Sequence, residues 1–324
     1  MKKIITVVIC LLTGTVLGRA AVASNTVEIV YNGNTATVTV AANISSYITN
    51  QSNGSSHVKL VQSASVSDAT GEITYILSGS TTDGEFYLDG SYKTTIELNG
   101  VTITNPSGPA LNIQDGKRVK VKLTEGKTST LSDGVNDDYN GCLHCKGHTE
   151  FRGKGTLNVT GNSRHAIYSK EYIQLKNATI NISNAVKDGI HCKEYFYMES
   201  GTVNITKAGD DGIQVEFNSG STTTGTTIEH EDENSGNFYQ DAGTLNIKGY
   251  NGKAIKTDGT ITYKGGTRNF SDADTQTTAV ATITSSPSSE TGTAYDLQGR
   301  KTNATRPGLY IFKNGNTTIK RIVR

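Results

Sequence analysis

The chain has 324 residues, of which 34% are apolar, and a formal net charge of +1. A net charge this close to zero argues against a nucleic-acid-binding protein that relies on counterion release. The length allows one large core or two modest ones.

Residues 1–23 have the pattern of a secretory signal peptide. Lys2 and Lys3 precede an apolar run from Ile4 to Leu12, and a small-x-small cleavage site follows at residues 21–23. The apolar run is too short to span a bilayer, and no later segment is a candidate. We therefore expect an exported protein that is not an integral membrane protein.

Residues 24–98 contain short stretches in which apolar and polar residues alternate. Thr37–Val40 and Ile73–Leu77 are examples. Alternation with period 2 is typical of half-buried strands. This region is predicted to be an N-terminal β region that leads into the main fold and caps its first coils.

A repeat between residues 99 and 270 predicts the architecture. One pentapeptide pattern, a small residue followed by threonine, an apolar residue, asparagine and a second apolar residue, occurs at Gly155–Val159, Ala178–Ile182, Gly201–Ile205 and Gly243–Ile247. The first three copies start 23 residues apart. One coil cannot bury its own inner face, so the coils must stack. The pattern predicts an all-β protein, a right-handed single-stranded parallel β-helix, with insertions at 133–140 and 218–237.

Stacking aligns the side chains of successive coils into columns. One column points inward: Leu111, Leu143, Ile167, Ile190, Ile213 and Ile255. The next column points outward: Asn112, His144, Tyr168, His191, Gln214 and Lys256. A second outward column follows: Gln114, Lys146, Lys170, Lys193, Glu216 and Asp258.

The three lysines of the second outward column indicate an anionic ligand. Lys146, Lys170 and Lys193 lie on successive coils, about 4.8 Å apart, where like charges repel. A polyanion whose charges repeat along the stack would relieve this repulsion, and Tyr168 would stack on a sugar ring. The alternative is a solvated lysine face. The predicted carbohydrate-binding residues are Lys146, Tyr168, Lys170, His191, Lys193, Gln214 and Lys256.

Another column, at the turn before these strands, contains acidic residues. Asp188 and Asp211 lie one coil apart, and Asp210 adjoins the second. Three carboxylates this close favour Ca²⁺, which takes several oxygen ligands at once. The alternative is that Asp-Gly simply forms the turn, which does not account for Asp210.

A zinc site built from His144, His191 and the cysteines fails on distance. His144 and His191 lie two coils apart, about 9.6 Å along the stack, whereas a zinc–ligand bond is about 2 Å. Cys145 and Cys192 are likewise two coils apart and are expected to be inert core thiols. Export leaves three cysteines, including Cys142, and an odd number cannot pair completely within one chain.

Several strings resemble a bacterial carbohydrate-binding β-helix family that is described as binding cellulose and pectic polymers. They are Leu98–Ile103, Gly108–Ile113, Ser129–Gly134, Val186–Ile190, Ala208–Gln214 and the acidic His230–Gly236. The family is similar in fold to calcium-dependent pectate lyases, and its members carry calcium. The resemblance implies that Asp188, Asp210 and Asp211 are calcium ligands. Those lyases use a lysine or arginine base, and Lys253 takes that place one coil beyond Asp211.

Residues 271–293 are rich in threonine, serine and alanine and are predicted to be a linker. Residues 294–324 are predicted to form a small β domain. Its strings Tyr295–Arg300, Pro307–Ile311 and Ile319–Val323 are similar to C-terminal sorting domains of the type IX secretion system. That resemblance implies passage to the surface of a Gram-negative bacterium, whereas the alternative is an accessory β domain.

Three functional hypotheses follow from these patterns. The first is calcium-dependent, non-catalytic binding of an acidic polysaccharide such as polygalacturonate by a secreted or cell-surface protein. The second is a polysaccharide lyase that acts by β-elimination with Lys253 as the base. The third is a structural or adhesive surface protein without a glycan ligand.

Overall fold

The computed structural model describes residues 22–219 and 233–272, and residues 293–323 apart from 297, 304–307 and 315–316. Most of the predicted signal peptide and linker therefore lies outside the described residues. The chain divides into two compact units, residues 1–278 and 279–324. Among the described residues no helix is long and apolar enough to cross a membrane.

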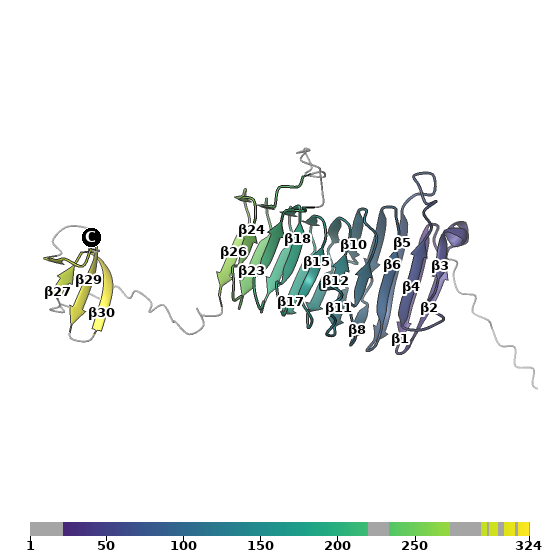
Figure 1. The fold of residues 1–324 in the computed structure, drawn as a ribbon, viewed down its shortest axis with the longest axis horizontal. Coiled ribbons are helices and arrows are strands. Elements are labelled where there is room, and N and C mark those ends of the chain that lie inside the picture. Colours follow the sequence, from purple (N-terminus) through teal and green to yellow (C-terminus); the bar gives the residue numbers. More distant parts are fainter. Residues whose placement is uncertain are drawn as a thin grey trace, which may run out of the picture. The chain divides into compact units, whose positions relative to one another are not determined.

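The first unit is a stack of coils, each of which adds one strand to each of three faces (Figure 1). Face 1 contains β3 Ile48–Asn50, β4 His57–Gln62, β6 Glu85–Asp89, β9 Leu111–Ile113, β12 Gly141–Cys145, β15 His165–Ser169, β18 Ile190–Lys193, β21 Ile213–Glu216 and β24 Ile255–Thr257. Face 2 contains β5 Ile73–Thr81, β7 Thr94–Leu98, β10 Val119–Leu123, β13 Thr149–Gly153, β16 Ile173–Leu175, β19 Tyr195–Met198, β22 Asn237–Gln240 and β25 Ile261–Tyr263. Face 3 contains β8 Thr102–Asn105, β11 Thr128–Asp133, β14 Thr156–Thr160, β17 Thr179–Asn184, β20 Thr202–Ile205, β23 Thr244–Lys248 and β26 Thr267–Ser271. The predicted parallel β-helix is confirmed.

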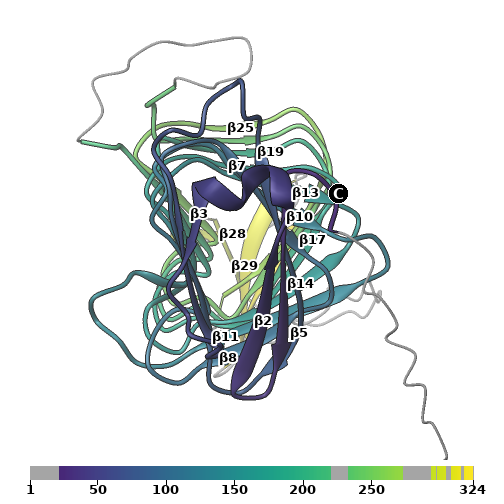
Figure 2. The same cartoon turned by 90° about the vertical axis from the view of Figure 1, so that its right-hand side faces the viewer.

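The parallel stack starts earlier than residue 99. β4 pairs with β6, and β6 with β9, in parallel, so the first coils lie within the region that the sequence assigned to a lead-in. These coils lack the threonine and asparagine pattern of the later repeats. Before them, β1 Thr26–Asn32 and β2 Thr35–Val40 form an antiparallel hairpin. The 3₁₀ helix η1, Ala42–Tyr47, lies at this end of the stack and buries Ile44 (Figure 2).

The repeated asparagine forms a ladder on the outside of face 3. Four side-chain hydrogen bonds of 2.7–2.9 Å join the amides of successive coils, through Asn158, Asn181, Asn204, Asn246 and Asn269. In the first four of these strands the apolar residues on either side of the asparagine point into the core, as Leu157 and Val159 do, whereas Asn269 in β26 lies between Arg268 and the exposed Phe270. The pentapeptide pattern is therefore the sequence of one face-3 strand. The ladder fixes the register of five coils.

Four polar atoms are buried inside the early coils without a hydrogen-bond partner among the described residues. They are Gln62 Nε2 and Oε1, Tyr75 Oη and Asp115 Oδ2. Gly90 leaves room between them, because a Cβ there would lie 2.7 Å from Gln62 Oε1 and 3.1 Å from Asp115 Oδ2. Burial raises the pKa of Asp115 to about 6, although Lys117 N–H donates to Asp115 Oδ1 at 2.8 Å.

This raised pKa predicts that Asp115 makes the fold less stable as the pH rises. The folded pKa of about 6 exceeds the unfolded value of about 3.9, so the stabilisation is complete below pH 4 and is lost as the pH passes 6. Asp115→Asn keeps an acceptor for Lys117 N–H but cannot ionise. Relative to the wild type, its free energy of unfolding should rise by about 3 kcal/mol between pH 4 and 7.5, measured by urea unfolding. Burial also raises the pKa of Asp133 to about 6. Asp133 is present in both proteins, so its contribution cancels from the difference between them. A pH-independent difference would show that the Asp115 carboxylate is compensated.

The second unit is a four-stranded antiparallel sheet. It consists of β27 Thr293–Tyr295, β28 Lys301–Thr302, β29 Gly308–Asn314 and β30 Thr317–Val323, in the order β28-β27-β29-β30. Asp296 closes the turn before β28, because its carboxylate accepts the Arg300 N–H at 2.9 Å and pairs with the Arg300 side chain. The predicted small C-terminal β domain thus has a sheet of its own.

Candidate functional site

The strands of face 1 align in the predicted columns. Leu143 pairs with Ile167, Ile167 with Ile190, and Ile190 with Ile213, so this column points into the core. The outward column forms a ring stack in which Tyr168 lies 5.3 Å from His144 and 5.5 Å from His191, centroid to centroid. Register therefore brings the predicted outward residues together.

The prediction that Tyr168 stacks on a sugar ring is wrong. His144 and His191 occupy the two faces of the tyrosine ring, and only 8% of Tyr168 is exposed. His191 and Gln214 are also almost completely buried. An outward direction did not ensure exposure, because stacked rings on adjacent coils cover one another.

The acidic column forms a ladder from side chain to backbone. Asp188 N–H donates to His165 Nδ1 at 3.2 Å, Asp211 N–H donates to Asp188 Oδ1 at 3.0 Å, and Lys253 N–H donates to Asp211 Oδ1 at 2.7 Å. Each side chain thus satisfies the backbone of the next coil. The register predicted across the insertion at 218–237 is confirmed by the last bond.

Asp188 is the most strongly held member of this column. It is 1% exposed, and its Oδ2 lies 2.9 Å from His191 Nδ1 and 3.1 Å from His165 Nδ1. Burial raises the pKa of the Asp188 carboxyl, but the contacts with the two imidazoles outweigh burial and hold this pKa below its usual value. Burial also lowers the pKa of His165.

The three predicted calcium ligands form one cluster, which we call the carboxylate corner. One carboxylate oxygen each from Asp188, Asp210 and Asp211 lies within 4.8 Å of the others. Asp210 is exposed, whereas Asp211 is buried and its Oδ2 makes no hydrogen bond of normal geometry with the described residues. Burial and the two neighbouring carboxylates raise the pKa of Asp210.

The carboxylate corner fits a hard cation. An oxygen that accepts one N–H keeps a second lone pair for a metal. Gly252 lies against the cluster, and a Cβ there would be 2.4 Å from Asp211 Oδ1 and 2.7 Å from Asp210 Oδ1. The exposed Asp210 and the Asp211 carboxylate, whose Oδ2 lies against the Lys256 ammonium, supply oxygen donors for Ca²⁺, which binds six to eight oxygens including water.

The lysine that contacts the carboxylate corner is Lys256 rather than Lys253. Lys256 Nζ lies 3.1 Å from Asp211 Oδ2, and this contact with Asp211 raises the pKa of Lys256. Lys253 occupies the predicted column position, but its side chain is exposed and its described contact with Asp211 is made by the backbone N–H. The predicted place of Lys253, one coil beyond Asp211, is confirmed, but the ammonium that reaches the carboxylates is that of Lys256.

The predicted lysine row is only partly free. Lys193 Nζ lies 3.7 Å from Glu216 Oε2, so its charge is balanced by the next coil. Lys146 and Lys170 are exposed and make no ion pair with residues 22–219 or 233–272. Two cations of the row, rather than three, are therefore available to an anionic ligand.

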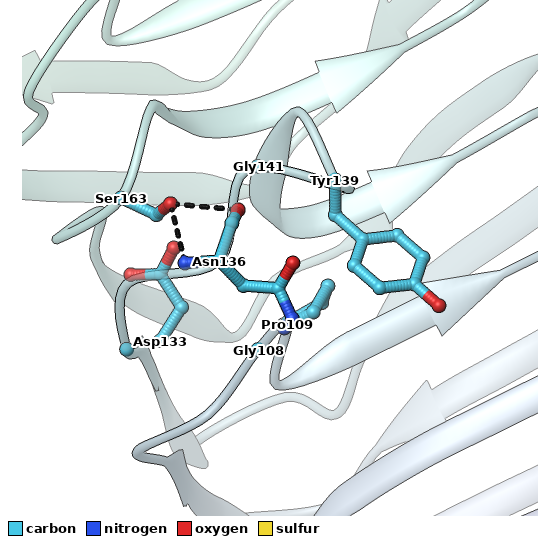
Figure 3. Close-up of a pocket in the computed structure, with 8 residues that line it drawn as sticks. Gly108, Pro109, Asp133, Asn136, Tyr139, Gly141 and Ser163 are labelled. Carbon is cyan, nitrogen blue, oxygen red and sulfur yellow. Dashed lines mark hydrogen bonds between the residues drawn. The ribbon is translucent and has the colours of Figure 1, made fainter.

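The acidic column continues toward earlier coils into a shallow depression. Pro109 and Gly141 lie in that column, and Asp133, Asn136 and Ser163 gather beside them (Figure 3). Asn136 N–H donates to Ser163 Oγ at 3.0 Å, and Ser163 Oγ donates to Asn136 O at 2.9 Å. These bonds fix the turn after β11.

Sequence reasoning missed Tyr139, which lines the same depression. Its ring stands apart from the polar group in Figure 3, is half-buried, and contacts His144 edge-on at 5.5 Å. It therefore keeps ring surface for a ligand, unlike Tyr168. Tyr139 lies in the insertion at 133–140, where no periodic pattern marks it.

Comparisons with known proteins give one family and one fold. A family model described as "Carbohydrate-binding domain-containing protein" matches residues 62–306. A curated protein of the same description from Acetivibrio thermocellus is 28% identical over 121 residues, which cover 33% of this chain and 42% of that protein's length. A polysaccharide lyase-like protein from C. thermocellum, solved as a gadolinium derivative, superposes with a TM-score of 0.54 at 20% identity, over 76% of this chain and 94% of that one.

Proposed function

Because this chain belongs to the carbohydrate-binding domain-containing protein family, we propose that it binds an acidic, pectin-like polysaccharide along face 1 with the help of Ca²⁺. The observation that carries the proposal is the carboxylate corner, where two coils supply three carboxylates whose oxygens lie within 4.8 Å of one another. Ca²⁺ held by Asp188, Asp210 and Asp211 would bridge to uronate carboxylates of the polymer.

Two further features support an acidic ligand. Lys146 and Lys170 are exposed on consecutive coils and supply positive charge. Tyr139 offers a partly exposed ring near the start of the face-1 strands, where a sugar can stack. A polymer that lies along the stack would meet these groups together with the carboxylate corner.

Retention on a polygalacturonate gel tests this proposal. The full chain should be retained with Ca²⁺ and released by a chelator. Asp210→Asn, at an exposed position, should weaken retention about tenfold or more, because one calcium ligand loses its charge. The double variant Lys146→Ala, Lys170→Ala should weaken it less, and Lys127→Ala, an exposed lysine between β10 and β11, should not. Retention that is indifferent to the chelator would contradict the proposal.

The same assay separates binding from cleavage. A lyase that acts by β-elimination creates unsaturated ends, which absorb in the ultraviolet. We expect no such increase, because the exposed Lys253 side chain is not held against the carboxylate corner. An increase that disappears in Lys253→Ala would instead establish the lyase.

We also propose that the protein acts outside the cytoplasm of a Gram-negative bacterium. The support is the signal-peptide pattern of residues 1–23 and the small C-terminal sheet with its resemblance to type IX sorting domains. A mature N-terminus near Ser24, found by mass spectrometry of the surface fraction, is the expected result. An intact Met1 in that fraction would contradict cleavage.

A further inference from the structure

Three side chains from consecutive coils meet where face 1 passes into face 2. His148 precedes β13, Glu171 precedes β16 and Glu194 precedes β19. His148 Nε2 lies 3.0 Å from Glu171 Oε2 and 3.5 Å from Glu194 Oε2, and the three atoms lie within 4.8 Å of one another. One imidazole nitrogen and two carboxylate oxygens therefore converge on one point, which we call the His148 corner.

The ligand atoms of the His148 corner are held in place. The Tyr172 ring stacks on the His148 ring at 4.1 Å and 12°, and Tyr195 stacks on Tyr172 at 4.7 Å. Asn218 Nδ2 donates to Glu194 Oε1 at 3.1 Å, which leaves Glu194 Oε2 directed at the imidazole. Glu171 Oε2 is a buried atom without a hydrogen bond of normal geometry to the described residues.

The spacing of these atoms suits a small divalent ion. Zinc bonds to nitrogen and oxygen are about 2.0–2.2 Å, so ligand atoms at the corners of a tetrahedron lie about 3.3–3.6 Å apart. His148 Nε2 lies 3.0 Å from Glu171 Oε2 and 3.5 Å from Glu194 Oε2, close to these distances. Imidazole with carboxylates suits first-row transition metals, whereas Ca²⁺ prefers oxygen alone. We propose that His148, Glu171 and Glu194 form a second metal site that binds Zn²⁺ or a similar first-row divalent ion.

A metal at the His148 corner would cross-link three coils and the base of the long insertion. Glu194 O accepts N–H bonds from Ser235 at 3.2 Å and Gly236 at 2.6 Å. Asn218 and Asn234 exchange two bonds of 2.9 Å at the ends of the insertion. A metal that fixes Glu194 would therefore stabilise both ends of the insertion. The half-buried His148 and Glu171 leave access from solvent for the ion and a water ligand.

The site is separate from the carboxylate corner. Asp188 and Glu194 stand at opposite ends of β18, six residues apart, which is about 20 Å in a strand. A variant that loses metal binding at one corner can therefore be distinguished from a variant that loses it at the other. The inference does not depend on the proposed glycan binding.

Calorimetric titration of the metal-free full chain with Zn²⁺, in excess Ca²⁺, tests the inference. We expect one Zn²⁺ per chain in the wild type and in Asp210→Asn. Glu171→Gln, which keeps the size of the side chain, and His148→Ala should each weaken Zn²⁺ affinity about 100-fold or more, because a ligand is lost. Zn²⁺ should also raise the melting temperature of the wild type but not of His148→Ala. Co²⁺ should give the visible absorption of a tetrahedral site.

Two controls keep the inference falsifiable. His57→Ala removes a histidine that pairs with Asp83 elsewhere and should leave Zn²⁺ binding unchanged. His165→Ala tests the other cluster, His165, Asp188 and His191, which is buried. Loss of binding in His165→Ala with retention in His148→Ala would place the metal there and overturn the inference. So would a folded wild type, judged by circular dichroism, that binds no Zn²⁺.

Discussion

Replacing Asp188 with alanine is expected to lower the free energy of unfolding by about 3–5 kcal/mol, the range for removing one partner of a buried charged group. The carboxylate accepts Asp211 N–H and contacts the imidazoles of His165 and His191. Alanine would leave Asp211 N–H without this acceptor in a buried place and would remove the carboxylate that both rings contact. The loss affects three consecutive coils at once.

Urea unfolding in a chelator measures this loss without a contribution from bound metal. Asp210→Ala is the matched control, because Asp210 is an exposed aspartate in the same cluster, and its effect should stay within about 0.5 kcal/mol. Asp188→Asn should fall between the two, because its amide oxygen still accepts Asp211 N–H. Equal effects of Asp188→Ala and Asp210→Ala would show that the ladder does not stabilise the fold.

The pH dependence of this contribution has a definite sign. Folding lowers the pKa of Asp188, so its stabilisation is present above the unfolded pKa of about 3.9. It is lost as the pH falls from that value toward the lower folded pKa. The difference between wild type and Asp188→Asn should therefore shrink in acid, in contrast to the pattern expected for Asp115.

The fold and its columns could be predicted because the repeat carries register information. The offset of eight residues from the last core Ile of a face-3 strand to the buried Ile of the next face-1 strand is constant, as from Ile205 to Ile213 and from Ile247 to Ile255. This offset fixes the pairs Ile190 with Ile213 and Ile213 with Ile255, although the first pair is 23 residues apart in the chain and the second 42. The insertion between the last two did not disturb this, since the core position must still be filled. The cluster of Asp188, Asp210 and Asp211 was predictable for the same reason.

The register of the coils predicted neither which side chains are exposed nor which atoms a long side chain contacts. Whether Tyr168 is exposed depends on the rings of neighbouring coils, and which lysine reaches Asp211 depends on side-chain direction at the corner. Lys256, on the outward column, bends to the carboxylate, while Lys253 points to solvent. Periodic patterns give the direction of a Cβ but not the path of a long side chain.

The His148 corner had a sequence signal that was not used. His148, Glu171 and Glu194 are spaced by 23 residues, the period of the repeat. The register is 24 residues between β13 and β16, so His148 stacks beside Tyr172 and reaches diagonally to Glu171. A search of the repeat for histidine and acidic residues in phase, including the corners, would have found it.

Gly147→Ala is expected to destabilise the fold by about 3 kcal/mol or more, at or beyond the upper end of the usual overpacking cost. Gly147 lies at the same corner, and a Cβ there would meet Lys117 O at 2.0 Å and Asp115 O at 2.7 Å. Both neighbours are backbone atoms of the previous coil, so no side-chain rotation can relieve the contact. The coils must separate locally instead.

Gly116→Ala is the matched control for this corner. Gly116 lies on the previous coil, and a Cβ there has no atom within 4 Å, so its effect should be within about 0.5 kcal/mol. Because His148 follows Gly147 directly, the separation caused by Gly147→Ala should also weaken Zn²⁺ binding although every ligand is retained. A stable Gly147→Ala protein with unchanged Zn²⁺ affinity would show that the corner yields without moving the imidazole, and that close packing of backbone does not set the ligand geometry.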